Sequence, residues 1–229
     1  RGVKSKLFFA AFLSVGGFIA LFFIRSASLA PISAEAALAG QIIVDPGHPQ
    51  WFLRNGVGPF FMCGAGDPED FLYRGSRNSD GTRSGGDQMT IVNRMKNNGG
   101  NAIYMYVVGS HGGDGGSTSN PFINSDPSQG LDQDILNQWE TWFTEMDNAG
   151  IAAYLFFYDD SAGIWTGDSV GSAERAFIQG IVNKFEHHKN FIWAISEEYA
   201  EQYSDARVKA IAAEIRAADD NDHPIVNHN

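Results

Sequence analysis

Short apolar runs alternate along most of this chain with segments whose apolar residues recur at helical spacing. Asn101–Val108, Ile151–Tyr158 and Phe191–Ile195 are apolar almost throughout, and His223–Asn227 forms a shorter run of the same kind. A half-exposed strand alternates apolar and polar residues, whereas a parallel strand covered on both faces does not. The pattern therefore predicts buried parallel strands at these positions.

Helical segments are expected between the strands. The first should begin after Asp87, which we expect to cap it, with Met89, Val92 and Met95 on one side. The others show their apolar residues at Leu136, Trp139, Phe143 and Met146; at Ile178, Ile181, Val182 and Phe185; and at Val208, Ile211, Ala212 and Ile215. Strand and helix thus alternate, which is typical of α/β folds built from β/α units.

The region before the first of these helices predicts a hairpin. Gln41–Asp45 is a short strand candidate, and Asn55-Gly56 is a strong turn signal between Trp51–Arg54 and Pro59–Cys63. Pro59–Gly64 is also the best candidate for the first strand of the parallel sheet.

Two α/β architectures fit this pattern, a doubly wound sheet and a (β/α)8 TIM barrel. The glycine fingerprint of a dinucleotide-binding doubly wound domain does not follow the first strand, which favours the barrel. A complete barrel takes about 250 residues. We therefore expect a barrel of the TIM type, truncated after about five β/α units.

The first residues have the order of an export signal. Arg1, Lys4 and Lys6 precede the apolar run Leu7–Ile24, and small residues follow. The run is also long enough to span a bilayer, so a signal peptide and a membrane anchor both remain open. We expect residues 1–39 to be this segment and residues 40–229 to be the domain, which would be secreted or periplasmic.

Composition limits the partners. The chain of 229 residues is 43% hydrophobic and 19% charged, as in globular proteins, and its formal net charge is −11. This acidity argues against nucleic acid or an anionic membrane surface as a partner, which leaves only the N-terminal segment to contact a membrane. Cys63 is the single cysteine, so an intrachain disulfide is excluded, and a buried structural thiol is expected.

Polar residues cluster where the predicted strands end, which is where parallel barrels carry their chemistry. After the successive strands come Gly66, Asp67, Glu69 and Asp70; Ser110, His111 and Asp114; Asp159 and Asp160; Ser196, Glu197 and Glu198; and Asn227 and His228. Trp165 lies in the loop after the third strand, where its ring could stack on a sugar. The side chains of His111, Asp114, Asp159, Asp160, Trp165, Tyr199 and His228 are the substrate-binding candidates.

The fourth strand runs directly into two adjacent carboxylates, Glu197 and Glu198. Neighbouring strand residues point to opposite sides, so only one of them can face the barrel axis. A partly desolvated glutamate has a raised pKa and can act as a general acid. The alternative is a solvated glutamate pair before a helix that starts at Tyr199.

The segment Trp193-Ala-Ile-Ser-Glu-Glu-Tyr199 resembles the strand-four signature of clan A glycoside hydrolases, Trp-x-x-x-Asn-Glu. It is more similar still to the Trp-Asn-Leu-Gly-Glu-Glu-Asn of secreted cellulase-like barrels. Further segments resemble the same relatives in the same order: Pro68-Glu-Asp-Phe-Leu-Tyr73 with Asp80-Gly-Thr82, Asn101-Ala-Ile-Tyr104 with Gly112-Gly-Asp-Gly115 and Pro121-Phe122, and His223-Pro-Ile-Val-Asn-His228.

The resemblance implies an exported retaining glycoside hydrolase that acts on a poly- or oligosaccharide and needs no cofactor. Glu198 would be the acid/base, and Glu197 would stand where the clan usually has Asn. We expect Glu198 to lie near Asp159, His111 and His228, and Glu197 to point elsewhere or to make a hydrogen bond that fixes the loop. The nucleophile of the family is a carboxylate on strand seven, to which no residue here corresponds, so the chain as given is expected to be inactive.

Other functions remain open. The chain could be a non-catalytic carbohydrate-binding barrel, or a metal-dependent α/β hydrolase that uses Asp159, Asp160 and Glu198. His111 and Asp114 could ligate a metal, but two ligands do not make a site. The segment Glu186-His-His188 is expected to be a solvated face at a helix end.

Overall fold

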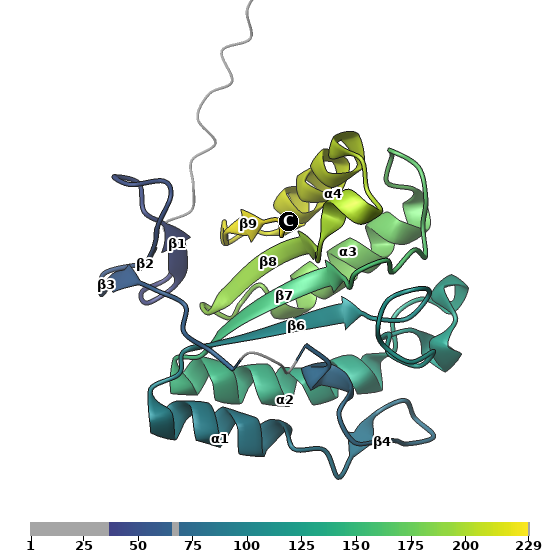
Figure 1. The fold of residues 1–229 in the computed structure, drawn as a ribbon, viewed down its shortest axis with the longest axis horizontal. Helices are drawn as coiled ribbons and strands as arrows, with labels where there is room; N and C mark the ends of the chain where they lie inside the picture. The colour runs from purple at the N-terminus through teal and green to yellow at the C-terminus, as the bar shows by residue number, and fades with distance from the viewer. Residues whose placement is uncertain (1–36, 66–68, 229) are drawn as a thin grey trace, which may run out of the picture. The chain divides into compact units, whose positions relative to one another are not determined.

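In the computed structural model, which describes residues 37–65 and 69–228, four parallel strands form the central sheet (Figure 1). They are β6 (Ala102–Val108), β7 (Ala152–Tyr158), β8 (Phe191–Ser196) and β9 (Ile225–Val226), and they lie in the order β6-β7-β8-β9. Strands that follow one another in sequence are thus neighbours in space, as in a β/α barrel. A doubly wound sheet would reverse its order partway across, so the predicted barrel topology is confirmed.

One helix precedes the first parallel strand, and each connection between successive strands contains another. The helices are α1 (Gln88–Asn98), α2 (Gln133–Ala149), α3 (Ser172–Phe185) and α4 (Asp205–Ala218). Helix α1 precedes β6, and α2, α3 and α4 connect the successive strands of the sheet. Figure 1 shows all four against the same side of the sheet. The other side, which would face a barrel axis, carries no helix from the described residues.

The helix faces pack largely as the periodicity predicts. Trp139 of α2, Ile181 of α3 and Ile211 of α4 are buried in one core with the outward-facing residues of the strands. The prediction was wrong at the start of α1, where Met89 is 36% exposed and Gln88 is buried instead. The Gln88 amide donates hydrogen bonds to two backbone carbonyls of the preceding segment, which makes burial of this polar side chain tolerable.

The helix ends follow local chemistry, with one exception. Asp132 and Ser204 accept hydrogen bonds from backbone N–H groups in the first turns of α2 and α4. Gly150 ends α2 in the left-handed conformation, at a φ of 69°. The predicted cap Asp87 makes no side-chain cap at α1, because its carboxylate pairs with Arg74 at 2.5 Å.

A small antiparallel sheet covers the beginning of the parallel strands. It consists of β1 (Ile42–Val44), β2 (Phe52–Arg54) and β3 (Gly58–Phe60), in that order, and contains the predicted hairpin. Its apolar residues Ile42 and Phe60 pack against Ala102, Ala152 and Ile192 at the N-terminal ends of β6, β7 and β8. A separate pair, β4 (Ser76–Arg77) and β5 (Arg83–Ser84), lies in the segment before α1.

The prediction that Pro59–Gly64 forms the first strand of the parallel sheet was wrong. Only Gly64 makes a parallel bridge, to Ala102. The side chain of Asn101 accepts a hydrogen bond from the backbone N–H of Cys63 and donates one to the carbonyl of Phe61, at 2.7 and 2.9 Å. These bonds use backbone groups that a regular ladder would need. Cys63 itself is exposed, so the expected burial of its thiol was also wrong.

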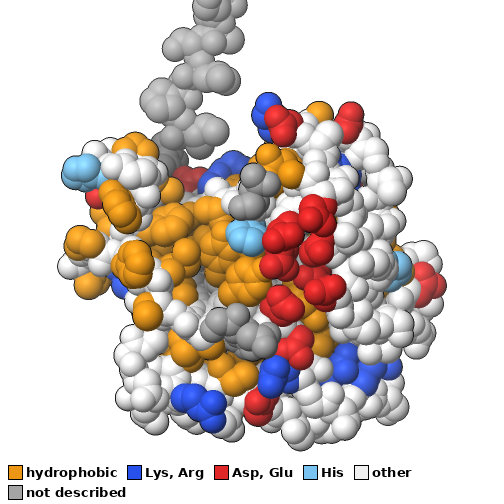
Figure 2. All heavy atoms as spheres, viewed as in Figure 1, with side chains coloured by type: hydrophobic (Ala, Val, Ile, Leu, Met, Phe, Trp, Pro, Cys, Tyr) orange, Lys and Arg blue, Asp and Glu red, His pale blue; other side chains and the backbone are white. Residues whose placement is uncertain are grey.

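The inner face of the parallel sheet is apolar and partly open. A hollow of about 320 Å³ lies over it, lined by Met62, Gly64, Ala65, Ala102, Tyr104, Tyr154 and His228. Figure 2 shows this hydrophobic surface next to a band of Asp and Glu side chains. The interior of a complete β/α barrel is filled by side chains from all its strands, so this face has the composition of a barrel interior.

The predicted export segment, with its apolar run Leu7–Ile24, lies outside the described residues. From Ala37 onward, none of the described helices combines the length and the apolar character needed to cross a bilayer.

Candidate active site

The C-terminal edge of the parallel sheet holds three acidic residues by backbone hydrogen bonds. The N–H of Asp159, the first residue after β7, donates to the carbonyl of Val108, and the N–H of Glu197, the first after β8, donates to that of Tyr158. The carbonyl of Glu69 accepts from the N–H of Tyr106 in β6. Three segments that are distant in sequence therefore meet at the C-terminal edge of the sheet.

The carboxylates of Glu69, Asp159 and Glu197 meet there, with one oxygen of each within 4.8 Å of the others. Asp159 is only 1% exposed, and the other two are half-buried. One oxygen of Asp159, Oδ2, accepts a hydrogen bond of 2.9 Å from the backbone N–H of Asp114, while Oδ1 is buried without a hydrogen-bond partner. We call these three residues the carboxylate cluster.

Burial and the charge of Glu69 perturb the pKa values of Glu197 and Asp159. Burial, followed by the nearby charges of Glu69 and Glu198, raises the pKa of Glu197 to about 7. Burial is also the main cause that raises the pKa of Asp159 to about 7; the charge of Glu69 acts in the same direction, and the hydrogen bond from Asp114 opposes it. Near neutral pH, these carboxyl groups can therefore hold and release protons, as a general acid or base must.

Glu198 lies in a different group, which corrects the expectation that Glu198, rather than Glu197, lies beside Asp159. Its side chain is exposed and approaches Asp160 and Glu201, with one oxygen of each within 4.8 Å of the others. Glu198 adopts a φ of 35° and a ψ of 47°, in the left-handed region that residues other than glycine rarely occupy. The chain turns at this point, and it is Glu197 that lies beside Asp159.

The loop after β6 closes over Asp159. It is rich in glycine, and at Gly113 the close approach is required, because a Cβ atom there would lie 2.9 Å from both Asp159 Oδ2 and the carbonyl oxygen of Gly109. Asp114, a predicted substrate-binding residue, contributes its backbone N–H to Asp159 and exposes its side chain. His111 is exposed, and its Nδ1 lies 2.7 Å from the hydroxyl of Ser110.

A polar cavity of about 370 Å³ adjoins the cluster. It is lined by Glu69, Asp70, Tyr73, Arg74, Tyr106, Asp114, Gly115, Gly116 and Ser119. Arg74 contacts the carboxylates of Asp70 and Asp87 at 2.7 and 2.5 Å, which fixes a positive charge at one wall. A cavity of this size, with polar groups of both signs, suits a small polar ligand.

The remaining predicted residues are distributed around this edge. His228 lies beside the turn that follows β8: its Nδ1 is 3.5 Å from the backbone N of Glu198, and its ring packs against Phe156 with centroids 5.9 Å apart. Tyr199 is half-buried, and its backbone N–H donates to the carbonyl of His228. The loop residue Trp165 is not brought to the cluster.

Trp165 instead packs onto the helix layer. Its ring lies 5.4 Å from that of Phe177 and 5.9 Å from that of Phe122, measured between centroids. It lines a separate depression of about 200 Å³, together with residues that include Asp168 and Tyr203. In this position, Trp165 cannot stack on a sugar that is bound at the carboxylate cluster.

Two members of the site were not among the sequence-based candidates. Glu69 was named only as a polar residue after the first predicted strand, and it is the Glu of the Pro68–Tyr73 segment that resembles known barrels, so a signal existed but gave no role. Tyr106 lies inside an apolar strand and carried no signal. In the structure its ring stacks on Tyr73 with centroids 5.8 Å apart, and burial, then the charge of Asp159, raises its pKa, so its hydroxyl stays protonated.

Comparison with known proteins identifies the fold. No model of a known protein family matches the sequence, and no curated protein does either. Solved structures do match. A Bacteroides vulgatus protein provisionally assigned as a glycoside hydrolase superposes with a TM-score of 0.59 and 16% identity, over 83% of this chain and 39% of its own.

Two further structures agree. A glycoside hydrolase family 5 protein of B. vulgatus has a TM-score of 0.56 and 14% identity, over 83% of this chain and 40% of its own. The β-mannanase of the blue mussel Mytilus edulis has a TM-score of 0.53 and 14% identity, over 83% of this chain and 63% of its own. The chain thus spans about two fifths of the length of the two Bacteroides proteins. It has the fold of part of a glycoside-hydrolase β/α barrel.

Proposed function

We propose that this chain is the N-terminal part of an exported retaining glycoside hydrolase, with Glu197 as its acid/base. The observation that carries the proposal is the carboxylate cluster at the C-terminal ends of β6, β7 and β8, where Glu197 has a pKa raised to about 7. The proposal of a sugar substrate combines this cluster with the fold shared with glycoside-hydrolase barrels. The fold by itself does not identify a substrate, because one barrel fold serves many chemistries.

Glu197 has the properties that the first step of glycoside hydrolysis requires. With a pKa of about 7, it is mostly protonated in mildly acidic solution, so it can donate its proton to the glycosidic oxygen as the bond to the sugar breaks. As a carboxylate, it can then accept a proton from the water that attacks the sugar–enzyme bond. Burial, together with the charges of Glu69 and Glu198, maintains the raised pKa.

Retention requires a second carboxylate, about 5–5.5 Å from the acid, to attack the sugar carbon. Asp159 is a poor candidate, because its own pKa is raised and its Oδ2 already accepts a hydrogen bond from Asp114. We propose that a later strand of the complete barrel supplies the nucleophile. The open apolar face of the sheet, over Tyr104 and Tyr154, would then pack against the later strands.

The test is hydrolysis by the complete gene product. It is assayed on β-linked manno- and gluco-oligosaccharides, and NMR follows the anomer that forms first. We expect cleavage with retention, and no turnover by the 229-residue chain alone. Absence of cleavage across a wide panel of oligosaccharides would contradict the function, and inversion would contradict the mechanism. Binding of oligosaccharides without cleavage would instead support a non-catalytic carbohydrate-binding barrel.

A metal-dependent hydrolase is the second candidate. Three carboxylates within 4.8 Å of one another can also bind a hard divalent cation such as Ca²⁺ or Mg²⁺. Activity of the complete protein that disappears with EDTA and returns with one of these cations would favour this candidate. The acid/base proposal expects the rate to be insensitive to EDTA.

A further inference from the structure

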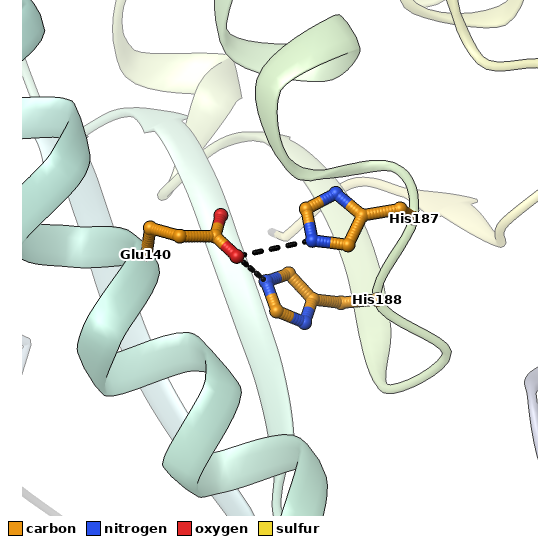
Figure 3. A group of neighbouring side chains, drawn as sticks. All are labelled: Glu140, His187 and His188. Carbon is orange, nitrogen blue, oxygen red and sulfur yellow. Dashed lines mark hydrogen bonds and ion pairs between the residues drawn. The ribbon is translucent and has the colours of Figure 1, made fainter.

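A second group of ionisable side chains lies between helices α2 and α3, away from the carboxylate cluster. Glu140 comes from the middle of α2, and His187 and His188 come from the turn between α3 and β8 (Figure 3). This turn precedes β8, whereas Glu197 follows it, so the two groups are at opposite ends of the strand. The sequence had predicted a solvated face at Glu186–His188, yet His188 is 4% exposed.

The three side chains converge on one point. Nε2 of His187 lies 3.0 Å from Oε1 of Glu140, and Nε2 of His188 lies 3.2 Å from the same oxygen. All three ligand atoms are within 4.8 Å of one another. Atoms bound tetrahedrally to Zn²⁺ at about 2.0–2.1 Å are roughly 3.3 Å apart, so small side-chain adjustments would suffice to coordinate one ion.

Two of the buried atoms in this group lack hydrogen bonds. Neither Nε2 of His188 nor Oε2 of Glu140 has a hydrogen-bond partner, and the 3.2 Å approach of His188 to Glu140 is not aligned as a hydrogen bond. Buried polar atoms are nearly always satisfied in folded proteins. A cation bound between the imidazoles and the carboxylate would satisfy both atoms at once.

The surrounding structure holds His188 in position. Its ring stacks on Phe191 with centroids 5.7 Å apart and touches the edge of Phe143 at 6.3 Å. Its backbone carbonyl lies 2.7 Å from Nε2 of the fully buried His223. Burial also lowers the pKa of His188, which keeps its imidazole in the neutral form that binds metals.

From this geometry we propose that Glu140, His187 and His188 form a binding site for a divalent transition-metal ion, with Zn²⁺ as the best fit. Two imidazoles and one carboxylate are ligands that Zn²⁺ prefers, and hard cations such as Ca²⁺ and Mg²⁺ favour oxygen ligands instead. The ion would connect α2 to the turn between α3 and β8. Because this end of a barrel serves stability rather than chemistry, the site is structural.

Titration of the metal-free 229-residue chain with Zn²⁺, without an affinity tag, tests the proposal by calorimetry. We expect one ion per chain and a rise in the melting temperature. The variants His187→Ala and Glu140→Gln should each weaken binding at least about tenfold. Both residues reach the surface, with 58% and 27% of their side chains exposed, so the variants are expected to fold.

Two control variants make the result specific. His48→Ala removes an exposed histidine between β1 and β2, whose ring lies 3.2 Å from Asp45, and it should leave Zn²⁺ affinity unchanged. Asp159→Asn alters the carboxylate cluster and should also leave it unchanged. The proposal is overturned if the parent chain does not bind Zn²⁺ below millimolar concentration, if His187→Ala binds like the parent, or if Asp159→Asn abolishes binding.

Discussion

Substitution of Asp159 by asparagine should stabilise the chain at alkaline pH and have little effect in acid. The pKa of Asp159 is raised from its usual 3.8 to about 7, mainly by burial. The folded chain therefore keeps a proton that the unfolded chain releases between these two values. Stability from this group is fully present below pH 3.8 and is lost as the pH rises through about 7. The Asp159→Asn variant carries no such charge and should not show the loss.

The size of the effect follows from the pKa difference. One pKa unit corresponds to about 1.4 kcal/mol, so a change from 3.8 to about 7 gives at most about 4 kcal/mol. Solvent screening, and the sharing of charge with Glu69 and Glu197, reduce this to about 1–3 kcal/mol. The carboxamide of the variant would retain an oxygen that accepts the hydrogen bond from Asp114, so the substitution changes mainly the charge.

The assay is urea unfolding of the parent chain and of Asp159→Asn between about pH 4 and about pH 8.5. The advantage of the variant should grow from the acidic end to about pH 7 and then remain constant. Asp126→Asn is the control, because hydrogen bonds from Gln129 and Ser128 lower the pKa of Asp126 below its usual 3.8. That variant should be less stable than the parent by an amount that stays constant across this pH range, since the parent loses this stabilisation only at lower pH. A difference between Asp159→Asn and the parent that is independent of pH would refute the reasoning.

Two further predictions concern the packing of the layers. Arg207→Ala should lower the free energy of unfolding by about 3–5 kcal/mol, because it leaves the buried Glu174 carboxylate without its charged partner at 2.5 Å. Arg175→Ala breaks a surface pair with Glu214 between the same two helices and should have a much smaller effect. Equal losses in chemical denaturation would contradict the burial argument. On the open sheet face, Tyr154→Glu should reduce self-association of the chain in analytical ultracentrifugation, since exposed apolar patches drive association; an unchanged distribution would show that this face is not the contact.

Local patterns predicted the strands and helices well, because burial on both faces and helical periodicity are recorded in neighbouring residues. The first parallel strand was mispredicted for a tertiary reason. The side chain of Asn101, 38 positions from Cys63 in the chain, takes the backbone hydrogen bonds that a regular strand would use. His188 was likewise expected in solvent, and contacts with Phe143 and Phe191 bury it.

The sequence predicted which edge of the sheet carries the site, but not which side chains contact one another there. The predicted ends of the strands correctly placed Asp159, Glu197 and Glu198 at one edge of the sheet. Which glutamate faces Asp159 depends on where β8 ends and on the left-handed turn at Glu198, and neither can be read from two identical neighbours. Tyr106 could not be found at all, because an aromatic residue in an apolar strand is indistinguishable from core.

The proposed mechanism depends on Glu197 as the proton donor, and paired substitutions test this role directly. In the complete gene product, Glu197→Gln and Glu198→Gln are compared on an unactivated oligosaccharide and on an aryl glycoside with an activated leaving group. Glu197→Gln should lower the rate on the oligosaccharide by about 10²–10⁴-fold and the first step on the aryl glycoside much less, while Glu198→Gln should stay within about tenfold of the parent on both. A normal rate for Glu197→Gln together with a large loss for Glu198→Gln would contradict the assignment of Glu197 as the acid/base.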